Sequence, residues 1–373
     1  MSYLVPGLLV ATLALAIAAS AAAVTKRGDD KANTIVGTPQ ADRLFGKGGD
    51  DTLRGLGGDD RLDGGGGADR LSGGDGDDRA DGGLRRDRVD GGNGNDRLTG
   101  GTNRDIVLAG PGNDRADGNG GADRVEGGAG NDQLVGGPGI DHVTGGAGDD
   151  GIEGDSQEDV LDGGDGADTI AGDAADDRIS GGPGNDTLNG GANEDRVDGG
   201  DGDDQIQGGV GSDLLFGGAG NDYVAERLAA VDEHVEGGPG DDYILTSGGP
   251  DRVILGGPGN DVLFGGRQRP EREGADQFGD GVSDGGPGND IVLGGSANDR
   301  VNGGEGDDVL YGGARLDIYD CGPGNDVAYV ENAFEALVAG VTCEQVIVGD
   351  PSVSDPSFDG LNGAPHAGKA TGG

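Results

Sequence analysis

Apolar residues recur at every ninth position of this chain, each two residues after an aspartate. The aspartate repeats without a gap from Asp42 to Asp222, and its apolar partner repeats from Leu44 to Val224. Side chains alternate between the two faces of a strand, so the three residues around each apolar position predict a very short strand with that residue pointing inward. The six residues between these strands, of the form GGxGxD, are expected to turn.

Two such units are expected to close one coil of 18 residues, with successive coils about 4.8 Å apart. Each unit can bury its apolar residue only against its neighbours, so stability accumulates by stacking. The repeat therefore predicts an all-β fold, a parallel β-roll (a β-helix solenoid) built from GGxGxDxUx nonapeptides, in which U is apolar. Aspartates 18 residues apart become neighbours along one edge of the roll.

The composition limits both the kind of core and the kind of partner that can be expected. Glycine supplies 89 of 373 residues and there is no tryptophan, so a core of large side chains is excluded, and only the strict register argues against disorder. The formal net charge of −45 disfavours nucleic acid and anionic membrane surfaces as partners and leaves cations as the expected counter-charge. Glycine turns expose carbonyl oxygens beside each aspartate, and hard oxygen ligands select Ca²⁺, so several calcium ions are the expected cofactor.

The motifs GGNGND at 91–96 and GGAGND at 127–132 resemble those of the hemolysin-type, or repeats-in-toxin (RTX), calcium-binding family. The resemblance covers about residues 37–326. It implies a right-handed parallel β-roll, with each Ca²⁺ held between successive turns by aspartate carboxylates and backbone carbonyls. It also implies that folding depends on Ca²⁺.

The two edges of the expected roll differ in the residue two before each aspartate. On the first edge, called edge 1, this residue is glycine in all ten turns that end at Asp60 to Asp222. On edge 2 five of ten turns have lost it, to Arg85, Asn103, Gln157, Ala175 and Asn193. Length changes, in 225–236 and near 267–284, are expected to fall on edge 2.

We therefore predict one continuous calcium stack and one patchy stack. The alternative is that turns without this glycine still bind through their remaining oxygens, because calcium coordination is flexible. The candidate ligands on edge 1 are Asp60, Asp78, Asp96, Asp114, Asp132, Asp150, Asp168, Asp186, Asp204, Asp222, Asp242, Asp261, Asp290, Asp308 and Asp326. Those on edge 2 are Asp51, Asp69, Asp123, Asp141 and Asp213.

An arginine file is expected on one outer face, because Arg61, Arg79, Arg97 and Arg115 each follow an edge-1 aspartate. It could form a basic binding stripe, but Asp63, Asp81 and Asp117 lie two residues further along on the same face. We favour salt-bridge ladders, each pair contributing little. Few residues suited to catalysis are present: the only histidines are His142, His234 and His366, HExxH does not occur, and the one GxSxG string, at 281–285, overlaps a repeat, so no enzyme activity is expected.

The ends of the chain differ from the repeats. Residues 1–23 combine an apolar stretch with an Ala-Ala-Ala site and predict a cleaved signal peptide, with an uncleaved anchor as the alternative. Residues 24–41 are expected to cap the N-terminal end of the roll, 42–326 to form the repeats, 327–349 to cap the C-terminal end, and 350–373 to be disordered. Outside the cell Cys321 and Cys343 are expected to form a disulfide.

The expected function is that of a secreted, extracellular, non-enzymatic calcium-binding protein that folds on binding Ca²⁺. The alternatives are a calcium-dependent adhesin with an unidentified cell-surface ligand, and a module that accompanies a secreted enzyme or toxin. No regular threonine array occurs on the outer positions, which argues against ice binding.

Overall fold

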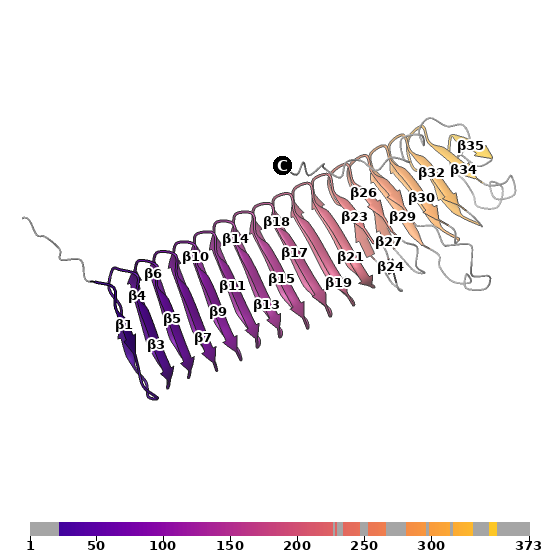
Figure 1. The fold of residues 1–373 in the computed structure, drawn as a ribbon. Helices are drawn as coiled ribbons and strands as arrows, with labels where there is room; N and C mark the ends of the chain where they lie inside the picture. The colour runs from indigo at the N-terminus through magenta and orange to yellow at the C-terminus, as the bar shows by residue number, and fades with distance from the viewer. Residues whose placement is uncertain are drawn as a thin grey trace, which may run out of the picture.

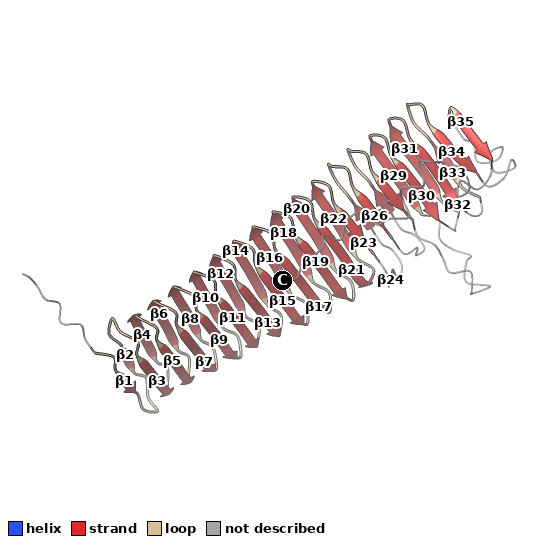
Figure 2. Cartoon of the chain, turned by 45° about the horizontal axis from the view of Figure 1, so that its top comes forward, coloured by secondary structure: helices blue, strands red, loops and turns tan. Residues whose placement is uncertain are grey.

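The structure, a computed structural model, describes residues 22–226, 228–229, 234–246, 253–265, 281–295, 298–313, 316–330 and 343–348. These residues form an elongated rod of two parallel β-sheets, whose strands lie across its long axis (Figures 1 and 2). No helix long and apolar enough to cross a membrane is found in the described part of the chain.

Sheet A contains 19 strands. They are β1 (Thr25–Arg27), β3 (Arg43–Gly48), β5 (Arg61–Gly66), β7 (Arg79–Leu84), β9 (Arg97–Thr102), β11 (Arg115–Gly120), β13 (Gln133–Pro138), β15 (Gly151–Ser156), β17 (Thr169–Ala174), β19 (Thr187–Ala192), β21 (Gln205–Gly211), β23 (Tyr223–Ala225), β24 (Leu228–Ala229), β26 (Tyr243–Leu245), β28 (Val262–Phe264), β30 (Ile291–Gly295), β32 (Val309–Gly313), β34 (Val327–Val330) and β35 (Gln345–Val348).

Sheet B contains 16 strands. They are β2 (Thr34–Val36), β4 (Thr52–Gly57), β6 (Arg70–Asp75), β8 (Arg88–Asn93), β10 (Ile106–Pro111), β12 (Arg124–Ala129), β14 (His142–Ala147), β16 (Val160–Asp165), β18 (Arg178–Pro183), β20 (Arg196–Asp201), β22 (Leu214–Ala219), β25 (His234–Glu236), β27 (Val253–Leu255), β29 (Val282–Pro287), β31 (Arg300–Glu305) and β33 (Ile318–Asp320).

The chain alternates between the sheets, so each strand pairs with the strand one coil later. Strand β3 pairs in parallel with β5, with Arg43 opposite Arg61, and β4 pairs with β6, with Thr52 opposite Arg70. Both registers are 18 residues, as the nonapeptide predicts. The expected parallel β-roll of 18-residue coils is therefore confirmed.

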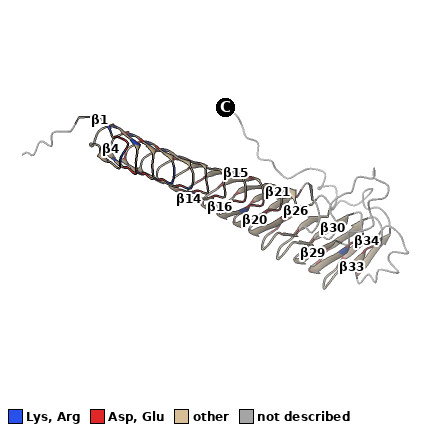
Figure 3. Cartoon of the chain, turned by 90° about the horizontal axis from the view of Figure 1, so that it is seen from below, with Lys and Arg blue, Asp and Glu red and all other residues tan. Residues whose placement is uncertain are grey.

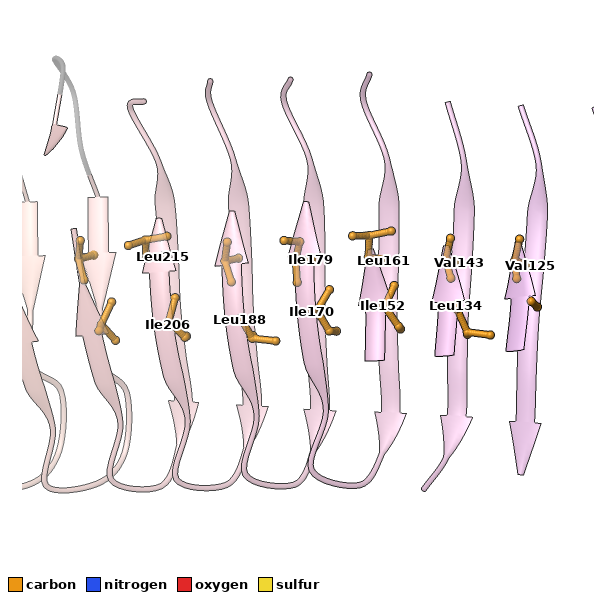
Figure 4. Packing of buried hydrophobic residues seen from close by; sticks show 14 of the residues in the cluster. Val125, Leu134, Val143, Ile152, Leu161, Ile170, Ile179, Leu188, Ile206 and Leu215 are labelled. Carbon is orange, nitrogen blue, oxygen red and sulfur yellow. The ribbon is translucent and has the colours of Figure 1, made fainter. Parts of the chain in front are cut away.

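The core lies between the two sheets and consists of the apolar residue of each repeat. Figure 4 shows Val125, Leu134, Val143 and Ile152 pointing into this space from successive strands. Every one of the predicted apolar residues from Leu44 to Val224 is buried, with 0–3% of its surface exposed. Burying a leucine or isoleucine side chain contributes about 1.5–3 kcal/mol, so the stack sums many equal contributions.

The strands are longer than the sequence pattern predicts. From β3 to β22 most span six residues, because the first three positions of the next GGxGxD motif stay paired with the neighbouring coil. Position 2 of the motif lies within the strand, and glycines adopt positive φ there, as at Gly74 with φ 118°. Only three residues remain for the sharp turn. The prediction of three-residue strands is thus wrong here and right for strands such as β26 and β28.

The N-terminal segment 24–41, expected to be a cap, contributes β1 and β2 to the first coil. At the other end β35 adds to β34 of sheet A. Cys321 and Cys343 approach each other there with their Cα atoms 5.2 Å apart, a separation that suits a disulfide. The predicted signal peptide up to residue 21, the insertion at 266–280, part of the C-terminal cap (331–342 and 349) and the tail 350–373 lie outside the described residues.

Candidate metal centre

The repeated aspartates are buried at the two edges of the roll, with 0–3% of their surface exposed. Each follows the short turn that carries the chain from one sheet to the other. One carboxylate oxygen, Oδ1, accepts a hydrogen bond from the backbone N–H of the aspartate one coil earlier: Asp78 N–H donates to Asp96 Oδ1 at 2.8 Å. The carboxylates therefore tie successive coils together, a role the sequence pattern alone does not reveal.

On edge 1, where the chain passes from sheet B to sheet A, this ladder is unbroken. It runs from Val24, whose N–H donates to Asp42, to Glu344, which accepts from the N–H of Asp326. The donor–acceptor distances along it lie between 2.5 and 3.1 Å. It persists where the coil lengthens to 20, 19 and 29 residues.

On edge 2, where the chain passes from sheet A to sheet B, the ladder runs from Asn33 to Asp213. Beyond Asp213 the described residues contain one further step, from Asp299 to Asp317. The lengthened segments after β23 and β28 connect sheet A to sheet B, as predicted, and so belong to edge 2. The structure thus places all the irregularity in length on one edge.

The second carboxylate oxygen, Oδ2, is also buried but accepts no hydrogen bond. This holds for every aspartate predicted as a metal ligand, on both edges. It holds equally for Asp87, Asp105, Asp159, Asp177 and Asp195, whose turns on edge 2 lack the glycine. The first aspartate of edge 1, Asp42, differs, because its Oδ2 accepts from the N–H and hydroxyl of Thr38.

These free oxygens fit a hard cation. Next to the first glycine of a turn, Gly73, a Cβ atom would lie 2.1 Å from Asp78 Oδ2 and 2.5 Å from the carbonyl oxygen of Gly91 in the next coil. A carboxylate and a carbonyl oxygen thus converge on a space that glycine leaves open. In the part of the chain that the structure describes, no three His, Cys, Asp or Glu side chains gather, so main-chain carbonyls would have to complete the 6–8 oxygens that Ca²⁺ takes.

The buried carboxylates of both edges need a counter-charge in order to ionise. Burial, reinforced by neighbouring aspartates, raises the pKa of Asp78, Asp96 and Asp132 to about 7, although the backbone N–H that each accepts acts in the opposite direction. On edge 2 burial likewise raises the pKa of Asp87 and Asp105 to about 7. Ionising these rows of buried aspartates therefore costs free energy unless cations lie between them.

The edges differ in the backbone of the turn rather than in the placement of the aspartates. At position 4 of the motif, edge-1 glycines from Gly76 to Gly306 have φ between 122° and 157°, which is essentially reserved for glycine. The residues that replace it on edge 2 adopt a tighter left-handed conformation, from 78° at Arg85 to 93° at Ala175. Of the ten non-glycine residues with positive φ in the described part of the chain, nine lie in the GGxGxD motifs that lead to edge 2, and Leu56 is the exception. These turns therefore orient their peptide groups differently and carry strain.

The sequence pattern did not predict several polar residues at these edges. The residue before each edge-1 aspartate is Asp or Asn in every turn from Asp59 to Asn325, except at Ala167. These residues form a second, exposed row that is joined by hydrogen bonds. For example, the Asn95 N–H donates to Asp77 Oδ1 at 2.9 Å. The recurrent GND and GDD triplets were the signal for it. Two further residues, Glu226 and Glu344, lie outside the repeat pattern. Glu226 is buried and hydrogen-bonded to Asp213. The N–H of Asp326 lowers the pKa of Glu344.

In a comparison with known protein families, the chain matches the RTX calcium-binding nonapeptide repeats. Successive, overlapping matches cover residues 27–62, 36–71, 45–80, 54–87, 72–107, 81–116, 99–134, 126–161, 162–197, 189–224, 236–269 and 284–314. No curated protein matches the chain.

Proposed function

Because the chain belongs to the family of RTX calcium-binding nonapeptide repeats, which match well over half of it, we propose that it is a secreted, non-enzymatic protein whose roll folds on binding Ca²⁺. The observation that carries this proposal is the row of buried aspartates on each edge: from Asp60 to Asp326 on edge 1 and from Asp51 to Asp213 on edge 2, their Oδ2 atoms accept no hydrogen bond. Acidic residues (red) recur along the rod (Figure 3). Cations between coils would satisfy these oxygens and remove the repulsion between neighbouring carboxylates.

The ligands proposed are the Oδ2 atoms of Asp60 and its counterparts along edge 1, together with the carbonyl oxygens of their glycine turns. Edge 1 supplies a turn of the same backbone conformation in every coil from Gly76 to Gly306, so it is proposed as the continuous calcium stack. Edge 2 holds equally buried aspartates, but half of its regular turns have a different backbone conformation and the ladder is interrupted after Asp213. It is proposed as a patchy stack.

An exported location agrees with this chemistry. Calcium is available outside the cell, and an oxidising compartment would allow Cys321 and Cys343 to pair. Export rests on the sequence of residues 1–23. A non-enzymatic role is favoured because the repeats occupy most of the length of the chain.

A titration of the mature chain with Ca²⁺, followed by far-ultraviolet circular dichroism, tests the proposal. A transition from coil to β-sheet, reversed by a chelator and not produced by Mg²⁺ at equal concentration, is the expected result. A chain that shows the full β-sheet signal in excess chelator at pH 8 would refute calcium-driven folding.

A further inference from the structure

Five arginines form a straight file on the outer face of sheet A. The parallel register places Arg43 opposite Arg61, Arg61 opposite Arg79, Arg79 opposite Arg97, and Arg97 opposite Arg115. All five side chains are exposed. Because neighbouring strands are about 4.8 Å apart, the file presents one guanidinium per coil along the axis of the rod. We call this surface the arginine file.

The described arginines of the file form no salt bridge with carboxylates of their own sheet, although the charge of Arg61 acts on Asp81. On sheet B, Arg88 pairs with Asp90 at 3.6 Å and Arg196 with Asp198 at 3.9 Å, as a salt-bridge ladder predicts. Among the described residues of sheet A, no arginine of the file has a carboxylate oxygen within 4.0 Å. The salt bridges expected between this file and Asp63, Asp81 and Asp117 are therefore not formed, and like charges stand opposite one another along the file.

A second file runs beside the first, two residues further along each strand, and consists of Asp63, Asp81, Thr99 and Asp117. Between the two files lies a shallow hollow of about 220 Å³, lined by Arg61, Asp63, Arg79, Asp81, Arg97 and Thr99. A ligand along this hollow would meet cations on one side and hydrogen-bond acceptors on the other. A complementary ligand would carry anionic groups along one side and hydroxyl donors along the other.

We propose that the arginine file and its hollow bind a linear acidic polysaccharide, laid along the rod with one carboxylate or sulfate over each coil. Guanidinium groups recognise such anions through paired, charge-assisted hydrogen bonds. The aspartates and Thr99 accept from sugar hydroxyls. A polymer whose charged groups recur at about 5 Å matches the coil spacing and adds contacts by multivalency.

Other polyanions fit this face less well. The outer positions of β5, β7, β9 and β11 offer no aromatic ring on which a base could stack, and Phe45 on β3 is already covered by the guanidinium of Arg27. Leu84, at the end of β7, is the only large exposed apolar side chain of these four strands, which is too little apolar surface to enter a membrane. The −45 charge of the chain opposes all polyanions, but calcium bound along the edges would reduce it.

The test uses the mature chain at a fixed, saturating free Ca²⁺ concentration, with binding measured by isothermal titration calorimetry. One probe is a heparin-derived oligosaccharide, which carries sulfates and carboxylates, and the other is an oligogalacturonate, which carries carboxylates alone. A neutral malto-oligosaccharide is the control. Binding of both acidic probes would identify carboxylate as sufficient, whereas binding of the heparin probe alone would assign the site to sulfate.

Two matched double variants test whether the polysaccharide binds at the arginine file. Arg79→Gln with Arg97→Gln removes the centre of the file, and Arg70→Gln with Arg88→Gln removes an in-register pair on sheet B. Both variants should keep the calcium-induced β-sheet signal, which separates this proposal from the proposed function. The first should lower affinity at least about tenfold and the second should leave it within about twofold. No binding of either acidic probe, equal losses in both variants, or tighter binding of duplex DNA would overturn the proposal.

Discussion

The backbone N–H of Asp261 donates to Oδ1 of Asp290 at 2.8 Å, although 29 residues separate the two along the chain. In a regular coil the separation is 18 residues, as between Asp290 and Asp308. The aspartates of edge 1 thus stay in register while the extra length is taken up between β28 and β29, on edge 2. An edge that holds constant geometry against insertions can support one uninterrupted row of identical sites.

The first prediction concerns the turn glycine. Gly94 on edge 1 has φ 130°, and a Cβ there would lie 2.2 Å from the carbonyl oxygen of Gly76. Gly94→Ala should therefore lower the free energy of unfolding of the calcium-loaded chain by about 2 kcal/mol or more. On edge 2, Ala175 already adopts φ 93°, so Ala175→Gly should change it by less than about 1 kcal/mol. Chemical denaturation in Ca²⁺ checks both, and equal effects would count against an essential glycine geometry.

A second prediction separates the two edges by their aspartates. Asp96 lies on edge 1 and Asp105 on edge 2, in the turn that contains Asn103; both are buried and both have a free Oδ2. Asp96→Asn should reduce the number of bound ions and the steepness of the calcium-induced transition, because it interrupts the continuous stack. Asp105→Asn should leave the ion count unchanged. Calorimetric titration decides, and identical losses in the two variants would show that edge 2 binds as edge 1 does.

A third prediction follows from the raised pKa values of the aspartates. In the folded, metal-free chain the pKa of Asp78, Asp96 and Asp132 is about 7, against 3.8 for an ordinary aspartate, so folding takes up protons. The free energy of unfolding should be highest below about pH 4. Between about pH 4 and pH 7 it should fall by up to about 1.4 kcal/mol per pH unit for each such group, and above about pH 7 it should stay level.

Without calcium, the chain should therefore gain β-sheet signal when acidified from pH 8 to pH 4.5, and lose it on return. Circular dichroism in chelator measures this directly. In the presence of Ca²⁺ the dependence should invert, because protons compete with the metal for the carboxylates. A metal-free chain that becomes less structured on acidification would contradict the burial of these aspartates.

A fourth prediction concerns the C-terminal end. If Cys321 and Cys343 form a disulfide, reducing it should lower stability by about 3 kcal/mol, as expected for a closed loop of this size, since the residues are 22 apart in sequence. Loss should begin at β35, which follows Glu344, the last acceptor of the edge-1 ladder. Thermal unfolding with and without reductant measures the effect, and the Cys321→Ser, Cys343→Ser variant is the control. Two titratable thiols in the untreated secreted protein would refute the bond.

The sequence was sufficient to predict the roll, the inward apolar residue and the file of aspartates, because all three follow from one period. It did not predict that β3 continues to Gly48, because it treats a motif glycine only as a turn former, whereas neighbouring coils pair through it. It also missed the direction of the carboxylate of Asp96, whose Oδ1 binds a backbone N–H. A contact between residues 18 apart appears only when the coils are stacked.

The pattern of glycines predicted the inequality of the edges, but its cause is visible only in the backbone. Replacement of glycine by Arg85 or Gln157 leaves the following aspartate buried as before, while φ changes to 78° and 79°. Glu226 and Glu344 could not have been foreseen, because each reaches its aspartate from outside the repeat.

The most direct test of calcium-driven stacking is the number of Ca²⁺ ions bound by the mature chain, counted by equilibrium dialysis at saturating free calcium together with the β-sheet signal. Edge 1 has 16 aspartates from Asp42 to Asp326, so a complete stack on this edge alone predicts about 15 ions, one in each interval, plus a smaller number from edge 2. A count near this value, reached together with folding, would support the account. No bound calcium, or a count that fills every interval on both edges equally, would contradict it.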